Sequence, residues 1–365
     1  MSAGRHRAAR TSRRSGRPRR SGRRRALRLV VGLLVVAAVT GAGSAVWAYY
    51  KLNGNLTTAD ISGLVGDDRP PAVSTKALNI ALIGSDSRKG LDGQYGTGLT
   101  SAQSDTLMVL HLSADRKRAT VVSVPRDSWV EIPSCDLGDG ERSKPHSFKI
   151  NEAFALGSAD GGVAGGAACT IRTLEHNTGL RIDHFVEVNF AGFKDMVNAL
   201  GGVKMCLEEP VKDTKAHLDL PAGCQTIKDE DALAYVRARY SLGDGSDIGR
   251  IGRQQEFLQA LADKARSKLF DPAALYAFLD AATKSLTTDT QLGSLSKLTD
   301  LAKDLKSVPR DQLTFVTVPN VPRSTVEPSD QANVIWKKPQ AQKLFTALAR
   351  DEPVDADSVS APDGN

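Results

Sequence analysis

The sequence predicts an α/β protein: a three-layer α/β/α sandwich with a central mixed β-sheet, preceded by one N-terminal transmembrane helix. Three observations support this prediction. A run of 22 uncharged residues lies near the N-terminus, short segments rich in Val, Ile and Leu follow it, and these segments alternate with helical patterns. Strands that alternate with helices are typical of a layered α/β body.

The first 50 residues predict a membrane anchor with a basic tail. Residues 1–28 contain twelve arginines and no acidic residue, so the rest of this +6 chain is net negative. Residues 29–50 carry no charge and as a helix would span about 33 Å, enough to cross a bilayer. Because basic flanks stay in the cytoplasm, we expect a single-pass cell-membrane protein with an extracytoplasmic body. A cleaved signal peptide is the alternative, although its apolar core is usually only about 7–15 residues long.

The remainder is predicted to divide into a stalk linker (51–77), a compact domain (78–322), a C-terminal helical extension (323–350) and a disordered tail (351–365). Strands are expected at three apolar segments: 78–84, 105–112 and 118–124. Such runs are typical of a sheet that is buried on both faces. The glycine-rich segment 157–166 is expected to be a loop. It lacks the Gly-Lys-Ser/Thr ending of a nucleotide-binding phosphate loop.

The alternation continues along the domain. A helix ending at Gly179 is expected first, and then a strand, a helix and a strand at 184–190, 191–200 and 203–207. Residues 250–268 have the apolar stripe of an amphipathic helix. Its members are Ile251, Phe257, Leu258, Leu261 and Ala265. Further helices are expected at about 271–285, 291–306 and 336–349, and a further strand at 313–319.

Four cysteines fit an oxidising compartment outside the cytoplasm. An even count allows three pairings. Cys206 and Cys224 flank the segment "LEEPVKDTKAHLDLPAG", which resembles a hairpin, so we favour that pair together with Cys135 and Cys169. Zinc binding is the rival interpretation, but the chain has no C-x₂-C pair and its six histidines are scattered.

Charged residues stand directly beside the predicted strands. Asp86 follows the first strand, Asp105 opens the second, and Arg126 follows the third. Side chains in these places can meet at one edge of the sheet. Two carboxylates there can hold a hard cation such as Mg²⁺, which takes water and phosphate oxygens as its other ligands. Each aspartate taken singly could instead cap a turn.

The stretch "YVRARYSLGDGSDIGRIGRQQ" (235–255) gathers arginines on both sides of a glycine-rich turn. Before the turn, the spacing predicts an extended segment, 235–240, with Arg237 and Arg239 on one face. After the turn, a helix is expected to begin with three residues on a common face: Arg250, Arg253 and Gln254. Guanidinium forks and helix N-termini both bind phosphate oxygens. The alternative is a network of surface salt bridges with the acidic body.

Seven motifs come in the order and spacing of the LytR–CpsA–Psr family of actinobacterial type. They are "NIALIGSDSR", "SDTLMVLHL", "VVSVPRDSWV", "KINEAF", "GLRIDHFVEVNFAGFKDMVNALGGV", "ALAYVRARY" and "DIGRIGRQQ". The chain resembles this family over about residues 78–265. The resemblance implies an α/β/α sandwich and a membrane-anchored phosphotransferase. Such enzymes move a glycopolymer from a polyprenyl-pyrophosphate carrier onto peptidoglycan.

The resemblance also implies roles for single residues. It assigns Asp86 and Asp105 to Mg²⁺ or Mn²⁺. Residues implied to bind the pyrophosphate are Arg88, Arg126, Arg237, Arg239, Arg250, Arg253 and Gln254. Catalytic roles are implied for Arg126, Arg237 and Arg239, and Asp247 is the hypothesised base for the acceptor hydroxyl. Members often carry arginine where this chain has Gln103, so one head-group contact is lost or supplied elsewhere.

Other functions remain as alternatives at this point. The same arginines would serve a scaffold that binds polyprenyl pyrophosphate, or a pyrophosphatase in which water replaces the sugar hydroxyl. Spacing alone does not exclude a pair of carboxylates for glycoside cleavage. A membrane-anchored transcriptional regulator is a further alternative, but the sequence has no helix-turn-helix pattern and the basic tail is explained by topology. We therefore expect a polyprenyl-linked glycopolymer, peptidoglycan and membrane lipid as partners, and no nucleic acid.

Overall fold

The fold is known from a computed structural model that describes residues 20–72, 76–86, 103–138, 140–238, 247–268 and 270–355. Arg88, Arg239 and the end of the tail, 356–365, lie outside the described residues. The chain forms two compact units, which divide between Lys51 and Leu52.

The N-terminal unit consists of the helix α1 (Arg20–Asn55), whose last residues belong to the body. Its segment Leu29–Asn55 has a mean hydropathy of 2.3 over its most apolar window and is long enough to cross a membrane. Within the described chain this is the one helix that meets both criteria. A signal sequence would meet them too, so the prediction of an uncleaved anchor stays a prediction.

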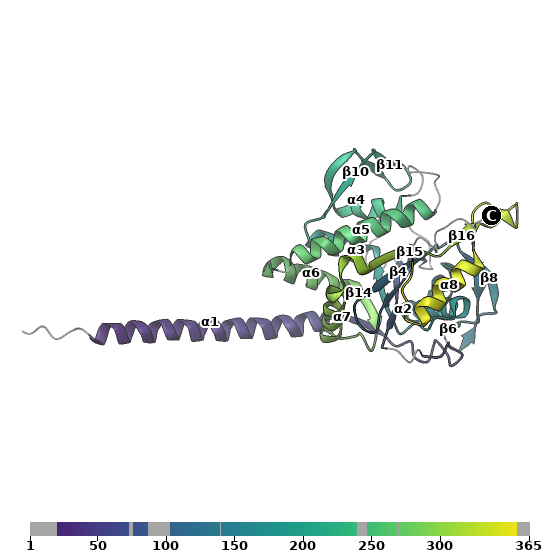
Figure 1. The fold of residues 1–365 in the computed structure, drawn as a ribbon. Coiled ribbons are helices and arrows are strands. Elements are labelled where there is room, and N and C mark those ends of the chain that lie inside the picture. Colours follow the sequence, from purple (N-terminus) through teal and green to yellow (C-terminus); the bar gives the residue numbers. More distant parts are fainter. Residues whose placement is uncertain are drawn as a thin grey trace, which may run out of the picture. The chain divides into compact units, whose positions relative to one another are not determined.

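A seven-stranded mixed sheet organises the body (Figure 1). Its strands, in spatial order, are β1 (Thr57–Ala59), β14 (Leu286–Asp289), β9 (His184–Asn189), β2 (Leu78–Ser85), β3 (Ser104–Leu112), β4 (Ala119–Val124) and β15 (Leu313–Thr317). β2 runs parallel to β9 and antiparallel to β3, and β4 runs antiparallel to β3. The three strands predicted first are therefore confirmed as the centre of the sheet.

Helices cover both faces of the sheet. All six residues of β4 are buried, as expected for a strand with helices above and below it. One face packs against α2 (Glu152–Thr178) and α8 (Lys338–Ala349), and the other against α5 (Asp247–Ser267) and α7 (Leu295–Ser307). This arrangement confirms the predicted sandwich.

The glycine-rich segment 157–166 is not a loop, so that prediction was wrong. It lies inside α2, which bends sharply at Gly162, where φ is +56°. A methyl group on Gly157 would stand 2.1 Å from the carbonyl oxygen of Gly165. The glycines therefore let two helical arms touch backbone to backbone.

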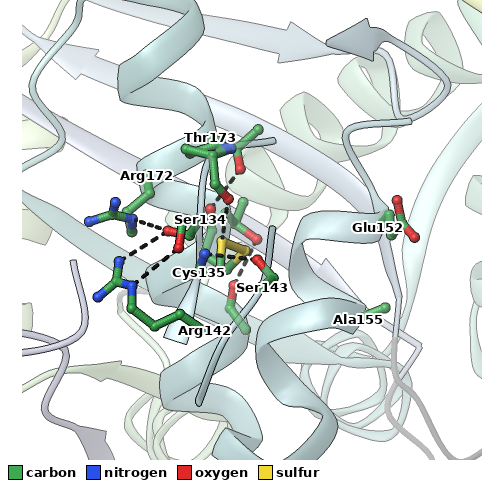
Figure 2. The surroundings of a disulfide bond; sticks show 12 residues. Ser134, Cys135, Arg142, Ser143, Glu152, Ala155, Arg172 and Thr173 are labelled. Atoms are coloured by element: carbon green, nitrogen blue, oxygen red, sulfur yellow. Dashed lines mark hydrogen bonds between the residues drawn. A yellow bond between two sulfur atoms is a disulfide. The ribbon is translucent and has the colours of Figure 1, made fainter. Parts of the chain in front are cut away.

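A disulfide ties the second arm of α2 to the chain before it. Cys135 and Cys169 are bonded and buried. Figure 2 shows Arg142 and Arg172 reaching the backbone carbonyl of Ser134, beside this bond. The second predicted disulfide is also confirmed, because Cys206 and Cys224 join β10 (Val203–Leu207) to β13 (Gly223–Ile227).

The prediction of an extended segment at 235–240 is also wrong for the residues of this segment that the structure describes. Tyr235 and Arg237 belong to the helix α4 (Asp229–Arg237). The remaining elements are short or lie at the margins of the body. They are β5 (Trp129–Ile132), β6 (Asp136–Gly138), β7 (Glu141–Arg142), β8 (His146–Lys149), α3 (Phe190–Ala199), β11 (Val211–Asp213), β12 (Leu218–Leu220), α6 (Pro272–Ser285), η1 (Arg310–Gln312), β16 (Asn320–Pro322), η2 (Arg323–Thr325) and β17 (Val334–Trp336).

Segments assigned by sequence to a linker and an extension are built into the body. β1 forms one edge of the main sheet, and Val65 is buried in the core. At the other end of the chain, Leu344 and Phe345 of α8 fill the same core. Beyond α8, the Asp351 carboxylate lies 3.2 Å from Nε2 of the buried His111.

Candidate active site at the edge of the central sheet

The polar residues that the sequence placed beside three strands do meet at one edge of the sheet. Ser85 at the end of β2 pairs with Ser104 at the start of β3, and the end of β4 lies next to them. Beyond this pair, the Asp86 amide donates to the Gln103 carbonyl over 2.9 Å, and the Gln103 amide donates to Oδ1 of Asp86. The backbone of Gln103 thus holds Asp86 in place. This role does not depend on the side chain at position 103, so the residue type could not have predicted it.

An ion pair joins two of the predicted site residues. Nη1 of Arg126 donates to Oδ1 of Asp105, and both side chains are less than one-fifth exposed. Nε of Arg126 also lies 3.8 Å from Oδ2 of Asp127. Nζ of Lys149 donates to the other oxygen of Asp127 over 3.1 Å. Asp127 and Lys149 were not among the predicted site residues. Asp127 nevertheless lies in the motif "VVSVPRDSWV", and Lys149 begins the motif "KINEAF".

Asp105 and Arg126 open into a cavity of about 410 Å³. Arg250 of α5 reaches it with a side chain that is nearly fully buried. Gln254, one turn later, donates from Nε2 to Oγ1 of Thr106 over 3.1 Å and so ties α5 to β3. Arg237 also lines the cavity, and its guanidinium carbon lies 4.6 Å from the centre of the Phe190 ring. The arginines from the two sides of the glycine-rich turn therefore converge, although Arg237 stands on a helix.

Away from the sheet edge, the cavity wall is mainly apolar, and Asp213 and Lys215 also line it. Leu82, Met108 and Val186 face it from inside the sheet, further from the strand ends than Asp105. Helical side chains complete the wall: Phe190, Phe193, Met196, Leu233, Val236, Phe257, Leu258 and Leu261. Cationic side chains at one place and an apolar lining beyond them make the cavity amphipathic.

Arg253 has a different environment from the other arginines. Its side chain is buried, and Nη2 donates to the backbone carbonyl of Ala238, the last described residue before the glycine-rich turn. Burial lowers the pKa of Arg253 below its ordinary value, while the nearby Tyr235 and Asp213 oppose that shift. Burial also raises the pKa of Tyr235 to about 12, so this phenol stays neutral. Arg253 thus holds Ala238, the residue before Arg239 in the chain.

The carboxylates fit a hard divalent cation with few protein ligands. Within the described residues, no group of three or more His, Cys, Asp or Glu side chains gathers. Mg²⁺ commonly takes one or two carboxylates and completes its six positions with water and phosphate oxygens. The buried Oγ of Ser104, the residue before Asp105 in the chain, has no hydrogen-bond partner among the described residues. The side chain of Asp247, the hypothesised base, is not described; its backbone begins α5.

Comparisons with known proteins agree on one family. The model of the LytR_cpsA_psr family matches residues 48–350. "Probable cell wall biosynthesis protein LcpB" of Corynebacterium glutamicum is 34% identical over 88% of this chain and 69% of its own length. "Polyisoprenyl-teichoic acid–peptidoglycan teichoic acid transferase TagT" of Bacillus subtilis is 29% identical over 79% of this chain and 85% of its own length. The solved "LytR-Csp2A-Psr enzyme from Actinomyces oris" shares the fold, with a TM-score of 0.56 and 20% identity over 80% of this chain and 96% of that one.

Proposed function

Because the chain belongs to the LytR_cpsA_psr family, we propose that it transfers a glycopolymer from a polyprenyl-pyrophosphate carrier to peptidoglycan. One observation carries this proposal: a single cavity joins clustered arginines at the sheet edge to a long apolar wall. The name of the related TagT, a transferase of polyisoprenyl-linked teichoic acid to peptidoglycan, supports the same substrate class.

The two parts of the cavity match the two parts of such a carrier. A diphosphate needs several fixed cations, and Arg126, Arg237 and Arg250 supply them from three different elements. Guanidinium groups keep their charge and bind phosphate oxygens in pairs. An isoprenoid chain needs an apolar surface from which water is excluded, and the wall formed by the sheet and helices supplies it.

The reaction is a phosphoryl transfer. A hydroxyl of the peptidoglycan acceptor attacks the phosphorus that carries the glycopolymer. The bond from this phosphorus to the bridging oxygen breaks, and polyprenyl phosphate leaves with that oxygen. Asp247 takes the hydroxyl proton. Little covalent chemistry falls to the protein in such a reaction, so positioning and charge neutralisation dominate.

Arg126 and Arg250 neutralise the charge that shifts onto the leaving phosphate. Arg237 and Arg239 grip the diphosphate from the other side of the turn. Asp86 and Asp105 would hold Mg²⁺ or Mn²⁺, which when bound neutralises phosphate oxygens. The buried Gln254 ties α5 to Thr106 and the buried Arg253 ties α5 to Ala238, which helps to orient Arg237 and Arg250 before the substrate binds.

The proposed location is the outer face of the cell membrane, with α1 as the anchor and the N-terminus in the cytoplasm. The two disulfides support this location, since they persist in oxidising compartments. The apolar segment of α1 follows twelve arginines, which favour the cytoplasmic side.

The test is transfer by the purified full chain from a polyprenyl-pyrophosphate-linked saccharide to peptidoglycan fragments. Arg126→Ala and Arg239→Ala should each lower kcat by about 10²–10³, the usual loss for one donor to developing charge. Arg310→Ala is the matched control, because Arg310 is exposed and pairs with Asp263 on the outer surface of α5. Asp86→Ala and Asp105→Ala should remove the dependence on divalent metal.

The readouts separate the proposal from its alternatives. Near-normal transfer by Arg126→Ala, with an unchanged circular dichroism spectrum, would refute the site assignment. Release of polyprenyl phosphate without any product on peptidoglycan would point to a pyrophosphatase, and tight binding without release to a scaffold.

A further inference from the structure

Arg126 and Asp105 are assigned to different ligands, yet they bind each other. Arg126 is proposed to grip phosphate, and Asp105 to hold a cation. In the structure the Arg126 guanidinium donates directly to Oδ1 of Asp105, in a site where both side chains are mostly removed from water. An ion pair in such a place is stronger than one on the surface, because fewer water molecules screen it.

We infer that Arg126 competes with a divalent cation for Asp105, so that the cation and the diphosphate bind to this site with positive coupling. The inference rests on the proposed function, since it concerns the same two ligands. A cation that takes Oδ1 of Asp105 must displace the guanidinium that binds this oxygen. A diphosphate that binds Arg126 gives this guanidinium another anion. Each ligand therefore removes part of the cost of binding the other, and the effect is reciprocal.

The surroundings of Arg126 suit such an exchange. Oδ2 of Asp127 lies 3.8 Å from Nε of Arg126, whereas Asp105 is bound by Nη1. Asp127 is itself held by Lys149, from the end of β8, over 3.1 Å. A guanidinium that leaves Asp105 thus keeps an acidic neighbour and stays at the sheet edge.

The first experiment measures Mn²⁺ binding alone, by electron paramagnetic resonance of free Mn²⁺, on the full chain in detergent. Arg126→Gln removes the guanidinium that competes for Asp105. The dissociation constant for Mn²⁺ should therefore fall by about three- to tenfold, which corresponds to the free energy of one partly buried ion pair. Arg237→Gln is the matched control, since it removes the same charge from the same cavity. In the double variant Arg126→Gln/Asp105→Asn, the gain in Mn²⁺ affinity should be lost.

The second experiment measures coupling with farnesyl diphosphate as the probe. Its dissociation constant is determined with and without saturating Mn²⁺ for the wild type, Arg126→Gln and Arg237→Gln. Mn²⁺ bound to the free probe affects all three proteins equally. The gain in affinity on adding Mn²⁺ should be largest in the wild type and smaller by about three- to tenfold in Arg126→Gln.

Three results would overturn the inference. The first is Mn²⁺ affinity in Arg126→Gln that is no higher than in the wild type. The second is an equal rise in Arg237→Gln, which would show a general charge effect. The third is the absence of Mn²⁺ binding in every variant at millimolar concentration, which removes Asp105 as a ligand. Failure of the proposed transfer would appear separately, as a wild type that couples the two ligands but forms no peptidoglycan product.

Discussion

Under the proposed function, the size of the apolar part of the cavity would set how much of a prenyl chain the protein recognises. If each carbon takes about the 30 Å³ that a water molecule occupies in the liquid, the cavity of about 410 Å³ holds at most roughly 14 carbons, because the diphosphate takes part of the same space. That is about three isoprene units. We therefore expect affinity for prenyl diphosphates to rise with chain length up to farnesyl diphosphate and then to level off.

The expected slope follows from the burial of methylene-sized groups. Each one buried contributes about 0.8 kcal/mol, so a five-carbon unit contributes at most about 4 kcal/mol. Part of this is offset by the loss of internal rotation in the bound chain. A gain of at least about 1.4 kcal/mol, or tenfold in Kd, is expected for each unit that enters the cavity.

The assay is competition by dimethylallyl, geranyl, farnesyl and geranylgeranyl diphosphate against a fluorescent prenyl diphosphate, below their micellar concentrations. Leu261→Trp narrows the cavity, so the affinity should level off at a shorter prenyl chain. Val326→Trp is the control, because Val326 is exposed and does not line the cavity. Equal affinities across the series, or a steady rise beyond farnesyl, would refute the assignment of this cavity to the lipid.

Three further predictions concern stability. Replacing Cys135 and Cys169 together by Ala should lower the free energy of unfolding by about 4 kcal/mol, since the bond closes a 34-residue loop; a urea midpoint equal to that of the wild type would contradict this. Gly157→Ala should lower the free energy of unfolding by more than about 2 kcal/mol, because the added methyl group meets a backbone oxygen. Gly161→Ala is the control: a methyl group there meets open space, so the urea midpoint should hardly change. Burial lowers the pKa of the His111 side chain below 6.5, so the folded protein takes up this proton at lower pH than the unfolded chain does. The protein should therefore lose stability, measured as Tm, when the pH falls below 6.5. His111→Gln should make this decline in Tm shallower, and an unchanged decline would exclude His111 as its source.

The sequence was sufficient for the centre of the sheet because the strands there are marked locally. β2, β3 and β4 are short apolar runs, and each has a charged residue beside it at the edge that forms the site. The two disulfides could also be chosen, because Cys206 and Cys224 flank a hairpin in the sequence.

Sequence reasoning failed where tertiary contacts override local preference. Glycines 157–166 resemble a loop because glycine is a poor helix former. In the fold, the absence of side chains lets Gly157 and Gly165 bring two helical arms into contact, and that packing offsets the weak preference. The spacing of Arg237 and Arg239 suggested a strand, but Arg237 ends a helix that the acidic residues 229–231 begin, as the helix dipole favours.

The wall of the cavity could not be predicted at all, since its members are far apart in the chain. Leu82, Val186 and Leu261 each look like ordinary core residues in the sequence. They line one cavity only because β9 pairs with β2 and α5 crosses the same face of the sheet.

Under the proposed function, this combination would let a site built from arginines prefer a lipid carrier to soluble diphosphates. Arginine clusters bind any diphosphate, so Arg126, Arg237 and Arg250 alone give little selectivity. The apolar wall supplies it. A ribose placed against Leu82 or Met108 would leave its hydroxyls without hydrogen-bond partners, which costs about 1–3 kcal/mol for each buried group. A prenyl chain in the same place loses no hydrogen bonds and gains from every carbon that it buries.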